Sequence, residues 1–158
     1  MKPLLLATDG SPSAAEATRK AIELADAFNA PLIVATIWEI TYEPVGLPFG
    51  PVVADLDTLG REKALEIAER AAAEARDAGV EAETVVRRGV PAHELGQIAE
   101  SRDAQLIVLG SHGWGAVRRL LFGSVSTAVL HHATRPVLVV PSRVVASKPT
   151  REREKVEV

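Results

Sequence analysis

The sequence contains no cysteine, which excludes disulfides, cysteine-based zinc sites and thiol catalysis. It also lacks a basic excess, because 18 Lys and Arg stand against 21 Asp and Glu. Non-specific nucleic-acid binding usually needs such an excess. No run approaches the roughly 18 apolar residues of a membrane span, and the N-terminal apolar run is too short for a signal peptide. We therefore expect a cytoplasmic protein with neither nucleic acid nor membrane as a partner.

Several motifs of catalysis and nucleotide binding are absent as well. The chain has no G-x4-G-K-[ST], so it is not a P-loop protein. No G-x-G-x-x-G follows the first expected strand, which weakens a dinucleotide site, and no G-x-S-x-G marks a hydrolase elbow. No pattern assembles a nucleophile, a base and an oxyanion hole. The sequence thus favours binding over catalysis.

The most informative stretch that is present has glycines spaced as G-x2-G-x9-G-S. Gly110, Gly113, Gly123 and Ser124 occupy these positions, directly after the apolar run 105–109. Glycine lets backbone N–H groups approach an anion, because no Cβ intervenes. Gly123-Ser124 is expected to open a helix, whose N-terminus carries a partial positive charge. Such a strand–loop–helix unit is typical of a cradle for nucleotide phosphates.

Short apolar runs alternate with amphipathic segments along the whole chain. Strands are expected at residues 4–8, 31–38, 80–86, 106–109 and 136–140. Helices are expected at residues 12–28, 54–78, 91–101 and 124–132, with Ser11 as a cap and with Asn29 and Gly79 as ends. The alternation predicts an α/β fold, a doubly wound five-stranded parallel sheet with helices on both faces, which is Rossmann-like.

The remaining segments define the domain. The length of 158 residues and the hydrophobic content of 47% suit one domain, expected over residues 1–142, with a charged, mobile tail over 143–158. Residues 39–53 form an irregular loop, for which a functional role and partial disorder are equally open. The helix 54–78 is expected to carry one apolar face, formed by Leu56, Leu59, Leu65, Ala68, Ala72 and Ala75.

Taken in order, five segments resemble a single-domain universal stress protein. They are Asp9-Gly10-Ser11, Gly89-Val-Pro91 and the stretches 106–113, 119–126 and 135–140. The resemblance covers about residues 2–140, and the spacing G-x2-G-x9-G-S is the mark of that family's ATP-binding branch. It implies a fold like that of the adenine nucleotide alpha hydrolases. It also implies ATP or another adenine nucleotide as ligand, with or without Mg²⁺.

The resemblance further implies a site at the carboxyl ends of the strands, where ligands bind in such sheets. Asp9, preceded by Ala7 and Thr8, would contact the adenine–ribose end, and Ile37 would pack on adenine. The ribose and phosphates would meet the remaining candidates, which are Gly110, Ser111, His112, Gly113, Gly115, Arg118, Arg119, Gly123, Ser124, Val125 and Ser126. No residue is given a catalytic or metal-binding role.

Plainer interpretations of these residues stay open. Asp9 could simply cap the first helix, and Arg118 and Arg119 could form a solvated loop face. A receiver domain with Asp9 as phosphoacceptor is disfavoured, because the acid cluster and the lysine after the last strand are missing. The adjacent His131 and His132 diverge by about 100° on a helix, so they cannot easily share a metal.

The expected function is that of a stress-response module that binds ATP and is read by an unidentified protein partner. The alternative is an enzyme, either a slow ATPase or a protein that phosphorylates itself on Ser124 or Ser126. The resemblance also implies a homodimer that pairs along residues 137–140, since a long apolar edge strand needs covering.

Overall fold

Strands and helices alternate in the computed structural model, which describes residues 1–39, 51–113 and 122–142, with only the backbone of 51–55. The expected tail and most of the expected loop lie outside these residues. The elements are β1 (Leu4–Ala7), α1 (Pro12–Phe28), β2 (Leu32–Trp38), α2 (Pro51–Asp77), β3 (Ala82–Arg88), α3 (Pro91–Ser101), β4 (Leu106–Gly110), α4 (Ser124–His132) and β5 (Val137–Val140). The strand pairs are parallel, in the order β3-β2-β1-β4-β5. The predicted doubly wound sheet is confirmed.

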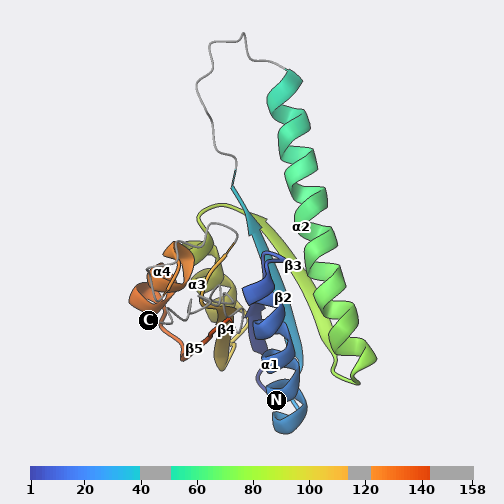
Figure 1. Cartoon of the computed structure of the whole chain (residues 1–158), viewed down its shortest axis with the longest axis vertical. Coiled ribbons are helices and arrows are strands. Elements are labelled where there is room, and N and C mark those ends of the chain that lie inside the picture. Colours follow the sequence, from blue (N-terminus) through green and yellow to red (C-terminus); the bar gives the residue numbers. More distant parts are fainter. Residues whose placement is uncertain (40–50, 114–121, 143–158) are drawn as a thin grey trace, which may run out of the picture.

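Helices cover both faces of this sheet. Figure 1 shows α1 and α2 on one side and α3 and α4 on the other, as their packing contacts require. Alternate residues of each strand enter opposite cores. Leu4 and Leu6 pack among alanines of α1 and α2, whereas Leu5 packs with Leu95 and Ile98 of α3. Burial on both faces explains why the strands read as nearly continuous apolar runs.

The ends of α1 follow from local chemistry, as the sequence predicts. Ser11 Oγ accepts the Ala14 N–H at 3.2 Å, and Pro12 occupies the first turn, where a missing N–H costs nothing. At the other end Asn29 is left-handed, with φ of 50°, and the Ala30 N–H donates to the Ala25 carbonyl.

Gly79 ends α2 in a similar way, with φ of +84°. The N–H of Val80 donates to the Ala75 carbonyl at 2.9 Å, so Val80 belongs to the helix end. The third strand therefore begins at Ala82, two residues later than predicted. The apolar character of Val80 reflects burial against the helix and not strand periodicity.

The start and the apolar face of α2 depart from the prediction. The helix begins at Pro51 instead of residue 54, because proline suits a first helical position. From residue 56 onward its buried residues are Ala64, Ala68, Ala71, Ala72 and Ala75, whereas Leu56 and Leu59 are 53% and 59% exposed and Leu65 is 39% exposed. Placing these leucines on the buried face was wrong.

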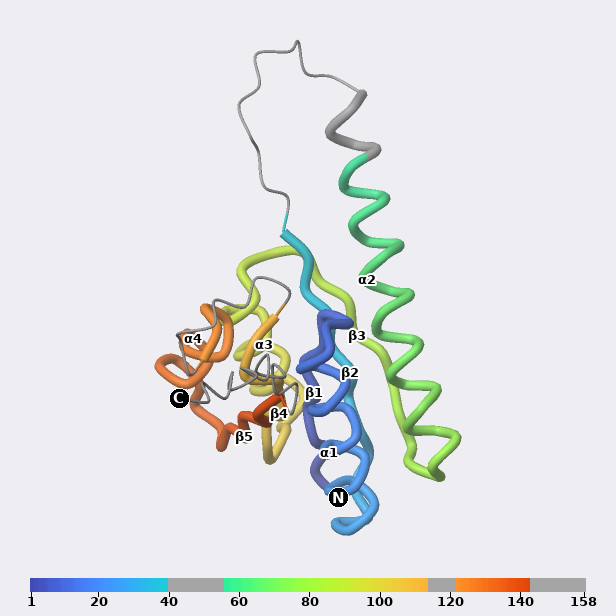
Figure 2. The backbone as a smooth tube through the Cα atoms, viewed as in Figure 1, coloured from blue at the N-terminus to red at the C-terminus, as the bar shows by residue number. Residues whose placement is uncertain are grey.

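The arrangement in space gives the reason why Leu56 and Leu59 are exposed. Figure 2 shows that the first turns of α2 run past the end of the sheet. Near this point the Trp38 ring fills the space beside Gly60, and its Nε1 donates to Asp57 at 3.2 Å. Among the described helices, α2 included, none combines the length and apolarity that a membrane crossing would need.

An ion cluster joins three segments at the amino ends of the strands. Asp103, just after α3, lies 2.8 Å from Lys2 Nζ and 3.0 Å from Arg135 Nη1. The hydrogen bond from Lys2 is the main cause that holds the Asp103 pKa below its ordinary value. Desolvation opposes it, and the hydrogen bond from Arg135 and the charges of both cations lower the pKa further. The backbone of Asp103 is left-handed, with φ of 50°, a conformation that asparagine also adopts readily.

We predict that Asp103→Asn lowers the melting temperature at neutral pH and has little effect in acid. A depressed folded-state pKa contributes stability above the unfolded-state value of about 3.9, and the contribution is lost as the pH falls through the folded-state value. Thermal unfolding of both proteins at about pH 7 and about pH 2.5 measures this. An equal difference at both pH values would show that the effect is not electrostatic.

Candidate functional site

A cavity of about 540 Å³ opens at the carboxyl ends of β1, β2 and β4. These strands flank the point where the strand order reverses, which is where ligands enter such sheets. Its lining comprises Ala7, Thr8, Asp9, Ala14, Ala35, Ile37, Pro91, Leu95, Leu109, Gly110, His112, Gly113, Phe122, Gly123, Ser124, Val125 and Ser126. The size falls within the range of small-molecule sites, about 300–1,000 Å³.

The structure brings together the predicted site residues that it describes, with one exception. Ser111 is buried beside the cavity and does not line it. Gly115, Arg118 and Arg119 lie outside the described residues. No sequence pattern indicated the apolar lining by Ala35, Pro91 and Leu95. Their positions are those of core residues, and the approach of α3 to β2 is a tertiary contact.

Asp9 lies in a tight turn between β1 and α1. Its Oδ1 accepts the Ser11 N–H at 2.9 Å, and the Gly10 N–H lies 3.3 Å from Thr8 Oγ1. Gly10 has φ of +76°, which favours glycine. Because Ser11 caps α1, Asp9 is not the cap residue. Its Oδ2 faces Gly113, where a Cβ would lie 2.7 Å away.

Gly110 has a packing role that its place in the motif did not reveal. A Cβ at this position would lie 2.5 Å from Ser13 Oγ and 2.7 Å from the Ser13 carbonyl carbon. The first turn of α1 therefore occupies the space that a side chain would need. Ser13 Oγ also accepts the His112 N–H at 3.3 Å, which ties the loop after β4 to α1.

The N-terminus of α4 opens into the cavity. Its cap residue, Gly123, offers no side-chain acceptor, and the first-turn residues Ser124, Val125 and Ser126 all line the cavity. The first N–H groups of a helix lack intrahelical partners and carry partial positive charge. Ser126 is 2% exposed, and its Oγ lies 3.0 Å from the carbonyl oxygens of both Ser111 and Gly123.

The backbone of Ile37 extends past the end of β1. The Thr8 N–H donates to the Ala35 carbonyl, and the Gly89 N–H donates to the Trp38 carbonyl, each at 3.0 Å. Backbone groups of successive strand residues point to opposite neighbours, so those of Ile37 point to the β1 side. Because β1 has ended there, the Ile37 carbonyl points toward the edge of the sheet where the cavity lies.

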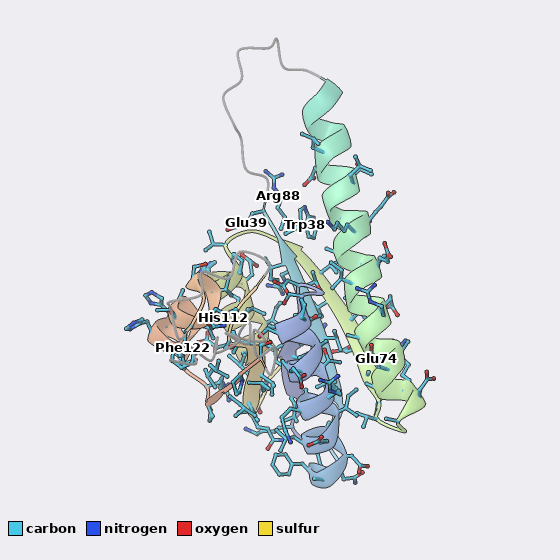
Figure 3. The ribbon with its side chains drawn as sticks, viewed as in Figure 1. Trp38, Glu39, Glu74, Arg88, His112 and Phe122 are labelled. Carbon is cyan, nitrogen blue, oxygen red and sulfur yellow. The ribbon has the colours of Figure 1, made fainter. Side chains whose placement is uncertain are left out.

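One of the four histidines lines the cavity, and the other three lie in helices. His112 lines the cavity, where Figure 3 labels it near Phe122. His131 and His132 lie in the last turn of α4, and His93 lies in the first turn of α3. In the part of the chain that the structure describes, no three His, Asp or Glu side chains gather as a metal site would require.

Comparison with known proteins adds the family. Residues 1–141 match the model of the universal stress protein family. The chain is 36% identical to a universal stress protein of Methanocaldococcus jannaschii over 140 residues, which cover 88% of this chain and 81% of the relative. It is 38% identical over 143 residues to one of Mycolicibacterium smegmatis, and the match covers 89% of this chain but only 46% of that longer relative.

Two similar solved structures are also universal stress proteins, and each is a complex with a nucleotide. A universal stress protein in complex with cAMP is 29% identical, with a TM-score of 0.61 and coverage of 89% of this chain and 97% of that one. The universal stress protein of Archaeoglobus fulgidus in complex with dAMP is 26% identical, with a TM-score of 0.64 and coverage of 89% and 98%.

We predict that Gly110→Ala destabilises the fold by about 1–3 kcal/mol, because the new methyl group would press on the Ser13 backbone. Gly96→Ala in α3 is the matched control. Nothing lies within 4 Å of a Cβ there, and alanine should stabilise the helix by about 0.5–1 kcal/mol. Urea unfolding measures both. A stable Gly110→Ala protein would contradict the packing role.

Proposed function

Since the chain belongs to the universal stress protein family, we propose that it binds an adenine nucleotide, ATP in particular, in this cavity. The observation that carries the proposal is the division of the lining into an apolar half and a half formed by a helix N-terminus. A flat base and an anionic phosphate chain would each meet suitable chemistry. The complexes of related proteins with cAMP and dAMP support the ligand class.

The apolar half suits adenine. Ala35, Ile37 and Leu95 offer aliphatic surface from β2 and α3, and removing a base from water against such surface is favourable. The Ile37 carbonyl supplies an acceptor for the exocyclic amino group of adenine. Guanine presents a carbonyl oxygen at that place, so the same acceptor would disfavour it.

The other half suits phosphates. The N–H groups at the start of α4 and the absence of a side chain at Gly123 form an anion site of the kind found at helix N-termini. Arg118 and Arg119, which lie outside the described residues, would add positive charge. A bound Mg²⁺ would be held mainly by phosphate oxygens, since Asp9 supplies the one carboxylate of the described lining.

We infer that the nucleotide acts as a signal in a stress response, read by a protein partner. Asp9 and His112 are the titratable side chains of the described lining, and one oxygen of Asp9 is engaged by the Ser11 N–H. These two side chains give little support for a catalytic site. If phosphate transfer to a serine does occur, exposed Ser124 is the acceptor, because the Ser126 hydroxyl is buried between two carbonyls.

Ser124→Asp tests the phosphate half of the proposal. Aspartate in the first turn favours the helix, so the fold should persist, while its carboxylate repels phosphates. We expect ATP affinity to fall about tenfold or more, with adenosine affinity nearly unchanged. Calorimetric titration measures both ligands.

Thr127→Asp, exposed one turn further along α4, is the matched control for this test and should bind ATP nearly as the wild type does. Equal loss of ATP and adenosine in Ser124→Asp would contradict the assignment of this half to phosphates. A wild-type protein that binds neither ligand would refute the proposed function itself.

We also propose a homodimer that pairs along β5, an edge strand of the sheet. The Val140 carbonyl accepts the Ser111 N–H from the β4 side, so the backbone groups of Val139 point to the free edge.

Val139→Pro tests this dimer. It would remove an N–H that points to the free edge and not to β4, and such an edge position tolerates proline. Light scattering should give twice the mass of one chain for the wild type and for Val139→Ala. For Val139→Pro it should give the mass of a single chain. A monomeric wild type would exclude the dimer.

A further inference from the structure

Ser111 is the one described candidate that misses the cavity, and its bonds suggest another role. It follows β4 directly and is 4% exposed. Its N–H donates to the Val140 carbonyl at 2.9 Å, and its own carbonyl accepts the Gly123 N–H at 2.6 Å. The main chain of Ser111 thus joins the ends of β4 and β5 to the residue that starts α4.

Two groups form hydrogen bonds with the side chain of Ser111. Its Oγ accepts the Ser142 N–H at 3.3 Å and lies 3.0 Å from Nδ1 of His112. A buried hydroxyl needs an acceptor for its proton. Within the described part of the chain, His112 Nδ1 is the atom near the Ser111 hydroxyl that can accept its proton. Donation by the hydroxyl to this nitrogen would satisfy that need, and it requires Nδ1 to be the unprotonated nitrogen of the ring.

Such a donation would fix the tautomer of His112. A neutral imidazole carries one proton, and a nitrogen that accepts a hydrogen bond cannot hold it. The proton must then lie on Nε2, which makes that nitrogen a donor. The backbone of His112 is also held, through its N–H bond to Ser13 Oγ. The backbone of the residue that lines the cavity is thus held by Ser13, and the Ser111 hydroxyl would hold its tautomer.

We propose that Ser111 is a positioning residue of the nucleotide site, which holds His112 as an Nε2–H donor to a phosphate oxygen of the ligand. The inference rests on the proposed function, because the phosphate is the group that the nitrogen meets. The same residue fixes Gly123 at the start of α4. One buried serine therefore sets two donors of different kinds, an imidazole and a helix N-terminus, toward one anion.

The tautomer of His112 in the ligand-free protein is the first test. Long-range ¹H–¹⁵N NMR distinguishes the two neutral forms, and His112→Ala assigns the signal among the four histidines. We expect Nε2–H in the wild type and in Ser111→Thr, which keeps the hydroxyl, and a mixture in Ser111→Ala. Ser126→Ala is the matched control, since this buried serine of the same region bonds carbonyls and not His112. Nδ1–H in the wild type, or no change in Ser111→Ala, would overturn the proposal.

A double-mutant cycle then connects the tautomer to binding. We expect Ser111→Ala to weaken ATP binding by about three- to tenfold, the effect of one well-placed hydrogen bond. In a His112→Ala background the same change should have a much smaller effect. Equal losses in both backgrounds would indicate a structural role alone. Failure of the wild type to bind ATP would refute the proposed function and leave the NMR result standing.

Discussion

The close approach of α1 to β4 at Gly110 determines the whole carboxyl edge of the sheet. Ser13 occupies the space of the missing Cβ, so the first turn of α1 lies directly on the end of β4. This contact brings the Asp9–Ser11 turn next to the His112–Gly113 loop, with Asp9 Oδ2 facing Gly113. The cavity walls would separate if a side chain forced the two elements apart. Gly110 is therefore required for packing, independently of any contact with a ligand.

Small hydroxyl side chains around this edge hydrogen-bond to the backbone of neighbouring segments. Thr36 Oγ1 donates to the Thr8 carbonyl, Ser126 Oγ joins α4 to Ser111, and Ser13 holds the His112 N–H. Each small hydroxyl forms a hydrogen bond with a backbone group of another segment. The edge gains fixed geometry without large side chains, which leaves room for a ligand.

Sequence patterns predicted the fold because each feature was local. The caps at Ser11 and Asn29 and the strand periodicity are decided by neighbours in the chain. The candidate residues were found because they follow strands, and parallel strands end at one edge. The leucines of α2 and the cavity lining by Leu95 could not be predicted, since both depend on how far one element extends along another. The bonds of Ser111 to Ser142 and His112 likewise involve tertiary placement.

The two halves of α2 have different sources of stability. From Ala64 onward, small side chains bring the helix close to the sheet, and alanine loses no rotamer freedom on burial. Around Leu56 and Leu59, hydrogen bonds along the helix and intrinsic propensity take the place of such burial. Amide protons in these first turns should thus exchange with solvent through local fraying, while those of the alanine-rich half exchange through openings close to global unfolding. A single continuous helix would thereby belong to two cooperative units, with the boundary near the Trp38–Gly60 contact.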